Sequence, residues 1–166
     1  MLSEVESRLE SARMPLEPGS KAPKFDLESD SGERATLKDF AGKWLVLYFY
    51  PKDSTPGCTR EGQEFSKAAA RLKKLGAQVV GVSRDSIKSH CTFKDKFKIS
   101  VPLLSDPERK THEAYGAWGM KTMYGKKVEG VIRSTFLVSP DGKIAKAWKG
   151  VKVDGHVEKV LEALGG

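Results

Sequence analysis

Residues 44–50 read WLVLYFY, an uninterrupted run of apolar and aromatic side chains. A strand with one solvated face alternates polar and apolar residues, whereas this run does not alternate, so it predicts a central strand covered on both faces. Prolines and a glycine break the run over residues 51–57. Apolar residues at helical spacing then predict a helix over residues 56–75, which Gly76 ends. The core therefore begins with a strand, a loop and a helix.

The segments that follow extend this pattern. Residues 77–83 form a second β-rich run, and residues 86–97 have the spacing and the capping residues of a helix. Further on, strands over residues 134–139 and 144–149 flank a Pro-Asp-Gly-Lys turn, and a last helix covers residues 155–164. Parallel crossovers followed by an antiparallel hairpin predict an α/β fold with a mixed central sheet flanked by helices, thioredoxin-like in outline.

The composition predicts one globular domain without a membrane span. Of the 166 residues, 39% are hydrophobic and 31% are charged, which is enough apolar surface for a core and too little charge bias for a disordered chain. The longest apolar run, residues 44–50, is far shorter than the roughly 20 residues that cross a bilayer. Glu4, Glu6 and Glu10 fit neither a secretory nor an organellar signal, so we expect a cytoplasmic protein that does not bind membranes.

The first twenty residues differ in character from the rest of the chain. Leu2, Val5 and Leu9 have the spacing of a weak amphipathic helix, which prolines and a glycine end. We expect residues 1–20 to be an N-terminal appendage with some helix. Residues 21–166 are expected to form the thioredoxin-like domain.

The excess of positive charge does not indicate a nucleic-acid partner. The net charge is +7, but basic and acidic residues are interleaved, as in KDKFK at residues 94–98, which is typical of solvated faces. The three histidines lack the spacing of a zinc site, and the glycines match neither the P-loop nor the dinucleotide-binding pattern. We therefore expect no nucleic acid, no metal and no organic cofactor.

Cys58 lies where the loop after the central strand enters the predicted helix. Free backbone N–H groups and the positive end of the helix dipole face this position, and both favour a thiolate. Two prolines stiffen the turn, and the hydroxyl of Thr55 stands three residues before the sulfur. Most lone cysteines are instead small buried hydrophobic residues, and these observations leave that alternative open.

Pro51, Thr55 and Cys58 stand in the spacing P-x-x-x-T-x-x-C, which resembles the active-site signature of the peroxiredoxins. The sequence TPGCT at residues 55–59 is similar to the bacterioferritin comigratory protein group, also called peroxiredoxin Q. Three distant stretches agree with this group, namely GVSRDS at residues 81–86, LLSD at residues 103–106 and IRSTFLV at residues 132–138. The resemblance covers nearly all of residues 21–164 in the same order.

The resemblance implies a role for each of five residues. Cys58 is the peroxidatic nucleophile, Thr55 holds the peroxide through its hydroxyl, Arg133 lies beside the sulfur and the peroxide oxygens, and Pro51 shields the sulfur from water. Glu61, one helical turn after Cys58, orients Arg133. Without the resemblance, Arg133 reads as a solvated strand end and Glu61 as a favourable acid in the first turn of a helix.

The resemblance leaves the resolving step with one candidate. Many members of the group place a second cysteine five residues after the first, but this chain has Gln63 there. Cys91 falls in the helix over residues 86–97, where another subset carries its resolving cysteine about one turn later. A disulfide needs Cα atoms within about 7 Å, so Cys58 and Cys91 would pair only after local unfolding. The alternative is an inert Cys91, with the sulfenic acid resolved by an external thiol.

The implied function is a thiol-specific peroxidase that reduces hydrogen peroxide and organic hydroperoxides through a cysteine sulfenic acid. Thioredoxin or a similar dithiol donor is expected to recycle it, and we expect a monomer, with a dimer left open. The alternative is a redox-sensing or holdase-like binding protein on the same fold, without efficient turnover.

Overall fold

The predicted central strand is β3 (Trp44–Phe49) in a computed structural model that describes residues 16–166, without the side chain of Met123. Successive side chains of β3 point to opposite faces of the sheet, and both faces are covered. Val46 and Tyr48 belong to one buried cluster, whereas Leu45 and Leu47 belong to another. The lack of polar alternation in the sequence therefore follows from burial on both sides.

The first part of the chain forms β1 (Asp26–Ser29), β2 (Arg34–Thr36), the 3₁₀ helix η1 (Leu37–Phe40), β3, α2 (Pro56–Lys74), β4 (Ala77–Ser83), α3 (Ile87–Phe97) and β5 (Leu103–Ser105). The second part forms α4 (Lys110–Ala114), β6 (Trp118–Met123), β7 (Lys126–Val131), β8 (Ser134–Val138), β9 (Ile144–Lys149) and α5 (His156–Ala163).

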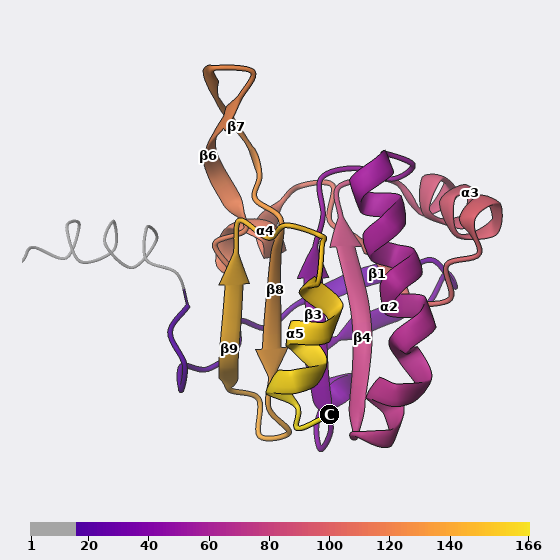
Figure 1. Cartoon of the computed structure of the whole chain (residues 1–166), viewed down its shortest axis with the longest axis vertical. Helices are drawn as coiled ribbons and strands as arrows, with labels where there is room; N and C mark the ends of the chain where they lie inside the picture. The colour runs from indigo at the N-terminus through magenta and orange to yellow at the C-terminus, as the bar shows by residue number, and fades with distance from the viewer. Residues whose placement is uncertain (1–15) are drawn as a thin grey trace, which may run out of the picture.

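One mixed sheet organises the molecule, with its strands in the order β2-β1-β5-β4-β3-β8-β9. The neighbours β3, β4 and β5 are parallel, whereas β8 is antiparallel to β3 and to β9. Helices α2 and α5 cover one face, and α4 lies behind the other (Figure 1). Each face has its own buried cluster, with Phe65 in one and Phe136 in the other. The predicted thioredoxin-like α/β fold is confirmed.

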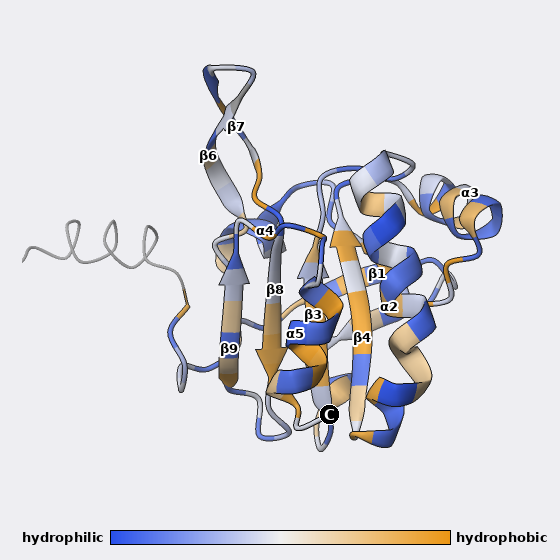
Figure 2. Ribbon diagram, in the orientation of Figure 1, coloured by the Kyte–Doolittle hydropathy of each residue, from blue (hydrophilic) through white to orange (hydrophobic). Residues whose placement is uncertain are grey.

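Several elements have no counterpart in the sequence prediction. β1, β2 and β5 have three or four residues each, too few for a clear period. The hairpin of β6 and β7 stands away from the sheet (Figure 1) and is mostly exposed, so no apolar face marks it in the sequence. Figure 2 shows this contrast, because β4 is apolar along most of its length, whereas most of the hairpin above the base of β7 is pale or hydrophilic.

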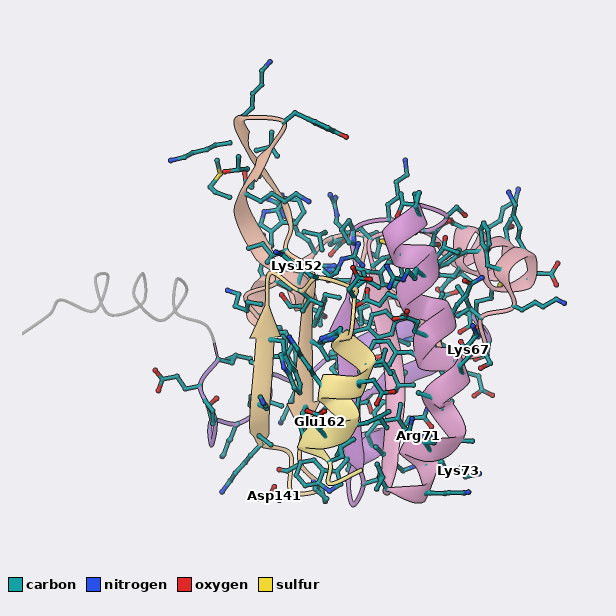
Figure 3. All side chains as sticks on the ribbon, in the orientation of Figure 1. Lys67, Arg71, Lys73, Asp141, Lys152 and Glu162 are labelled. Atoms are coloured by element: carbon teal, nitrogen blue, oxygen red, sulfur yellow. The ribbon has the colours of Figure 1, made fainter. Side chains whose placement is uncertain are left out.

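Charged side chains gather on the outer faces of the helices. Figure 3 labels Lys67, Arg71 and Lys73 on α2 and Glu162 on α5, all of which are exposed. This arrangement agrees with the solvated faces that the interleaved charges predict. No helix within residues 16–166 is long and apolar enough to span a membrane.

The predicted N-terminal helix lies mainly in residues 1–15, outside the described residues. The backbone of residues 19–22 follows the β8–β9 turn. The N–H of Gly19 donates to the carbonyl of Ile144 at 2.7 Å, and the N–H of Ala22 donates to that of Gly142 at 2.9 Å. The division into residues 1–20 and 21–166 stays a prediction.

Candidate active site

Cys58 lies in the first turn of α2, directly after the loop that leaves β3. Pro56 occupies the first turn, where its missing N–H leaves no helical bond unmade, and Thr55 is the N-cap. The hydroxyl of Thr55 does not cap the helix and instead donates to the carbonyl of Lys52 at 2.8 Å. The amides of Gly57 and Cys58 therefore stay available at the positive end of the helix.

Arg133 lies beside this end of α2, although it is 75 positions from Cys58 in the sequence. Because Phe49 at the end of β3 pairs with Ser134 at the start of β8, the residue before β8 lies beside the Cys58 loop. The Nη2 of Arg133 donates to the sulfur of Cys58 at 3.3 Å. A Cβ at Gly57 would lie 3.2 Å from the same nitrogen, so glycine lets the guanidinium approach. The Cys58 sulfur is buried, with 2% of the residue exposed.

Glu61 holds the other arm of this guanidinium. Its Oε1 accepts from Nη1 of Arg133 at 2.6 Å, and the Glu61 side chain is 1% exposed against 17% for Arg133. Burial raises the pKa of Glu61 to about 7, although the charge of Arg133 opposes the shift. Burial lowers the pKa of Arg133, but Glu61 and Cys58 outweigh it and leave that pKa raised. The guanidinium is thus fixed and permanently charged beside the sulfur.

Pro51 lies in the loop between β3 and α2. It is half-buried and lines a cavity of about 460 Å³ together with Trp118 and Val131. The indole of Trp118 is held under two guanidinium groups, with Arg109 at 4.5 Å and Arg84 at 5.2 Å from its ring centre. No sequence motif marks this cluster, because its members come from three separate segments.

Cys58, Arg133, Glu61 and Thr55 thus lie together at the start of α2. Comparison with known proteins identifies the family. The model of the AhpC/TSA family matches residues 18–147, and Peroxiredoxin Bcp from Xanthomonas campestris is 50% identical over 145 residues, 86% of this chain and 91% of the relative. This chain belongs to the peroxiredoxins of the AhpC/TSA family. Peroxiredoxin Bcp from Bacillus subtilis is 44% identical over 91% of the chain and 96% of the relative.

Solved peroxiredoxin structures share the fold. Peroxiredoxin Q from Xanthomonas campestris superposes with a TM-score of 0.80 at 49% identity, over 85% of this chain and 89% of that one. A PrxQ mutant from Xylella fastidiosa superposes with a TM-score of 0.86 at 41% identity, over 92% of this chain and 97% of that one. The predicted kinship with the bacterioferritin comigratory protein group is confirmed. This peroxiredoxin is a thiol peroxidase that acts on hydroperoxides and uses a thiol reductant.

Cys91 lies on the other helix that the sequence analysis singled out, α3. It is exposed, and its sulfur donates to the carbonyl of Asp30 at 3.3 Å. Cys58 and Cys91 are both free thiols. Gln63, which stands where many relatives are expected to have a second cysteine, donates from its side chain to the carbonyl of Phe97 at 3.2 Å. The two cysteines of this peroxiredoxin thus lie on separate helices.

A buried polar network beside the site escaped the sequence analysis. Asp53, five residues before Cys58, is 5% exposed and accepts hydrogen bonds from the side chains of Tyr50, Ser89 and His90. His90 is one of the three histidines that lack the spacing of a zinc site. Within residues 16–166, no three His, Cys, Asp or Glu side chains are grouped to hold a metal ion. Only the packing of α3 against the loop reveals the partners of Asp53.

Proposed function

We propose that Cys58 is the peroxidatic cysteine of this enzyme, that Cys91 resolves its sulfenic acid, and that thioredoxin or a similar dithiol donor recycles the disulfide. The Cys58 thiolate attacks one oxygen of the hydroperoxide, and the O–O bond breaks as two electrons pass from sulfur to oxygen. The departing hydroxide or alkoxide takes a proton and leaves as water or an alcohol. The sulfur is left as a sulfenic acid.

The observation that carries the role of Cys58 is that the guanidinium of Arg133 donates to two groups at once. One nitrogen is anchored 2.6 Å from Glu61, and the other lies 3.3 Å from the Cys58 sulfur. A planar guanidinium stays charged throughout the reaction and donates in several directions at once. It therefore stabilises the thiolate first and the charge on the departing oxygen afterwards. Glu61 acts through Arg133 and is a positioning residue.

Thr55 and Pro51 complete the substrate position in this proposal. The Thr55 proton is engaged by the carbonyl of Lys52, so its oxygen lone pairs are free to accept from the peroxide O–H. The free amides of Gly57 and Cys58 can donate to the oxygen that takes up charge. Pro51 excludes bulk water from one side of the sulfur.

Cys91 can resolve the sulfenic acid because its thiol is exposed. Its thiol attacks the Cys58 sulfenic acid, a disulfide forms, and water leaves. A dithiol donor then reduces the disulfide to two thiols and becomes oxidised itself. Because the cysteines lie on α2 and α3, the attack requires local unfolding of at least one helix end. If Cys91 attacks quickly, less of the sulfenic acid is oxidised by a second peroxide to the irreversible sulfinic state.

The proposal also covers the substrates, the oligomeric state and the cellular compartment. A solved structure of the Xanthomonas campestris relative is described as bearing on its alkyl peroxide reduction activity, and we extend organic hydroperoxides to this chain beside hydrogen peroxide. Cys58, Thr55, Glu61 and Arg133 all come from one chain, which supports a working monomer. Two free thiols and a dithiol donor suit the reducing cytoplasm.

Thiol titration after one equivalent of peroxide tests the two cysteine roles together. The wild type should lose both free thiols to a disulfide between Cys58 and Cys91. Cys58→Ser should lose all turnover, whereas Cys91→Ser should react once and then overoxidise. If mass spectrometry finds a sulfenic acid on Cys58 while Cys91 can still be alkylated, Cys91 is not the resolving residue. Steady-state turnover with thioredoxin separates a peroxidase from a redox sensor.

A further inference from the structure

Asp53 and His90 form a buried acid–base pair between the Cys58 loop and α3. The Nδ1 of His90 lies 2.8 Å from Oδ2 of Asp53, and the two side chains are 0% and 2% exposed. Asp53 belongs to the loop between β3 and α2. His90 lies in the first turns of α3 and directly precedes Cys91. The pair therefore joins the two segments that carry the cysteines.

The contacts of His90 define where its protons lie. Its Nε2 is 2.9 Å from the carbonyl of Leu104, which can only accept, so Nε2 carries a proton. Its Nδ1 faces the carboxylate of Asp53, so a second proton lies between these two groups. Both nitrogens are thus engaged in buried hydrogen bonds, of which the bond to Asp53 is charge-assisted. Separating the pair leaves buried polar groups without partners, so the contact resists partial opening.

Other donors make Asp53 the centre of this connection. The hydroxyl of Ser89 donates to the same Oδ2 at 2.8 Å, and that of Tyr50 donates to Oδ1 at 2.6 Å. Burial raises the pKa of Tyr50 well above its usual value, which keeps this hydroxyl protonated. Ser89 and His90 are neighbours in α3. Unwinding the start of α3 therefore removes two donors from Asp53 at once.

The loop needs this anchor because its backbone is strained. Ser54 follows Asp53 and has φ of 64°, in the left-handed region that side chains other than glycine avoid. The next residue is Thr55, the N-cap of α2. The N–H of Asp53 also donates to Oδ2 of Asp85, in the loop after β4, at 2.9 Å. Asp53 is thus held to this loop by its backbone and to α3 by its carboxylate.

We propose that Asp53 and His90 are positioning residues that couple the Cys58 loop to α3, so that the loop and the helix open together. While the pair is closed, the loop keeps Thr55 and Cys58 in the arrangement that reacts with peroxide. When α3 unwinds to bring Cys91 forward, the carboxylate loses its partners and the loop is released as well. The pair thereby sets how long the sulfenic acid waits for Cys91, an inference that rests on the proposed resolving role.

Asp53→Asn tests this coupling in two measurements. In the reduced protein, hydrogen exchange should accelerate by about tenfold in both α3 and residues 51–55, the change that loss of one charge-assisted hydrogen bond produces. After one equivalent of peroxide, disulfide formation should accelerate by a similar factor, and less sulfinic acid should form per turnover. His90→Gln keeps one donor for the carboxylate. It should accelerate hydrogen exchange and disulfide formation in the same way, but by smaller factors.

The chain offers a matched control in a second buried pair. Nδ1 of His112 lies 2.7 Å from Oδ2 of Asp106, with 0% and 3% of the side chains exposed, between β5 and α4. Asp106→Asn should lower stability and leave the ratio of disulfide to sulfinic product unchanged. If it shifts this ratio as Asp53→Asn does, general destabilisation explains the effect and the proposal is wrong.

Hydrogen exchange separates this inference from the resolving role of Cys91. Faster exchange in α3 of Asp53→Asn with unchanged residues 51–55 would overturn the coupling, whether or not a disulfide forms. If the wild type forms no disulfide while both segments open together, the coupling stands and the resolving role fails.

Discussion

Two buried acid–base pairs hold the segment that carries Cys58, and they connect it to different parts of the molecule. Arg133 and Glu61 join the residue before β8 to α2, so both partners belong to elements packed at the centre of the sheet. Asp53 and His90 join the loop to α3, a helix at the edge of the molecule (Figure 1). The first pair includes a contact to the sulfur, whereas the second reaches the helix that carries Cys91.

The difference teaches that similar contacts can serve different steps. A guanidinium that stabilises charge in the transition state must not move during the reaction, and the central sheet keeps it in place. A contact that must open between two chemical steps is better placed on a peripheral helix, where local unfolding costs less than global unfolding. Burial makes both pairs strong, and their location decides whether they can be released.

Arg133→Lys tests the first pair and should have the largest effect. Lysine keeps the charge but loses the planar fork, so it cannot bind Glu61 and the sulfur together. We expect the second-order rate constant for peroxide to fall by about a hundredfold or more. Stopped-flow mixing of the reduced enzyme with peroxide measures it. A loss of less than tenfold would mean that Arg133 does not need its fork.

Asp53→Asn should affect stability more than the peroxide reaction. This substitution removes one charge-assisted hydrogen bond of a buried pair, so we expect the free energy of unfolding to fall by about 1.5 kcal/mol. Urea unfolding of the reduced protein measures this loss, and Asp106→Asn should lose a similar amount. A peroxide rate as low as that of Arg133→Lys would remove the distinction between the two pairs.

Glu61→Gln sharpens the comparison through pH. Because burial raises the pKa of Glu61 to about 7, the folded protein keeps a proton that the unfolded chain has released. The Glu61 contribution to the free energy of unfolding should therefore fall by ~2 kcal/mol as pH rises from about 5 to about 7.

The measurement is the difference between the wild type and Glu61→Gln across this range. The difference is needed because burial lowers the pKa of His156 to about 4, so that residue contributes stability that is lost as pH falls below about 6.5. His156 is present in both proteins, and its contribution cancels. Parallel pH curves for the two proteins would mean that Glu61 is ionised throughout.

Lys94→Gln should have the smallest effect. Lys94 contacts Asp30 at 2.8 Å and helps to hold α3, but the two side chains are 18% and 17% exposed. A partly solvated pair contributes about 1 kcal/mol or less, so exchange in α3 should accelerate by less than about fivefold. Exchange in residues 51–55 should accelerate by the same small factor, because the proposed coupling makes the loop open with α3. An effect larger than that of Asp53→Asn would place the release point of α3 elsewhere.

The central order of elements could be predicted from the sequence because it depends on local patterns. The apolar run of β3, the helical spacing of α2 and the turn between β8 and β9 each follow from neighbouring residues. The same is true of the position of Cys58 at the start of a helix. The family motif added expected roles for Thr55 and Arg133. Short strands such as β5 and the exposed hairpin of β6 and β7 left no comparable pattern.

The sequence by itself determined which segment carries the reactive sulfur and which elements flank it. Only the tertiary structure placed Asp53 against His90, 37 positions away, and gave the distances that join Arg133 to the sulfur of Cys58 and to Glu61, 72 positions away. Neither Asp53 nor His90 looks unusual in the chain, because a polar residue in a loop or on a helix is usually solvated. Their importance comes from burial, which removes water as a partner and leaves each group dependent on the other. Burial of that kind exists only once distant segments have packed together.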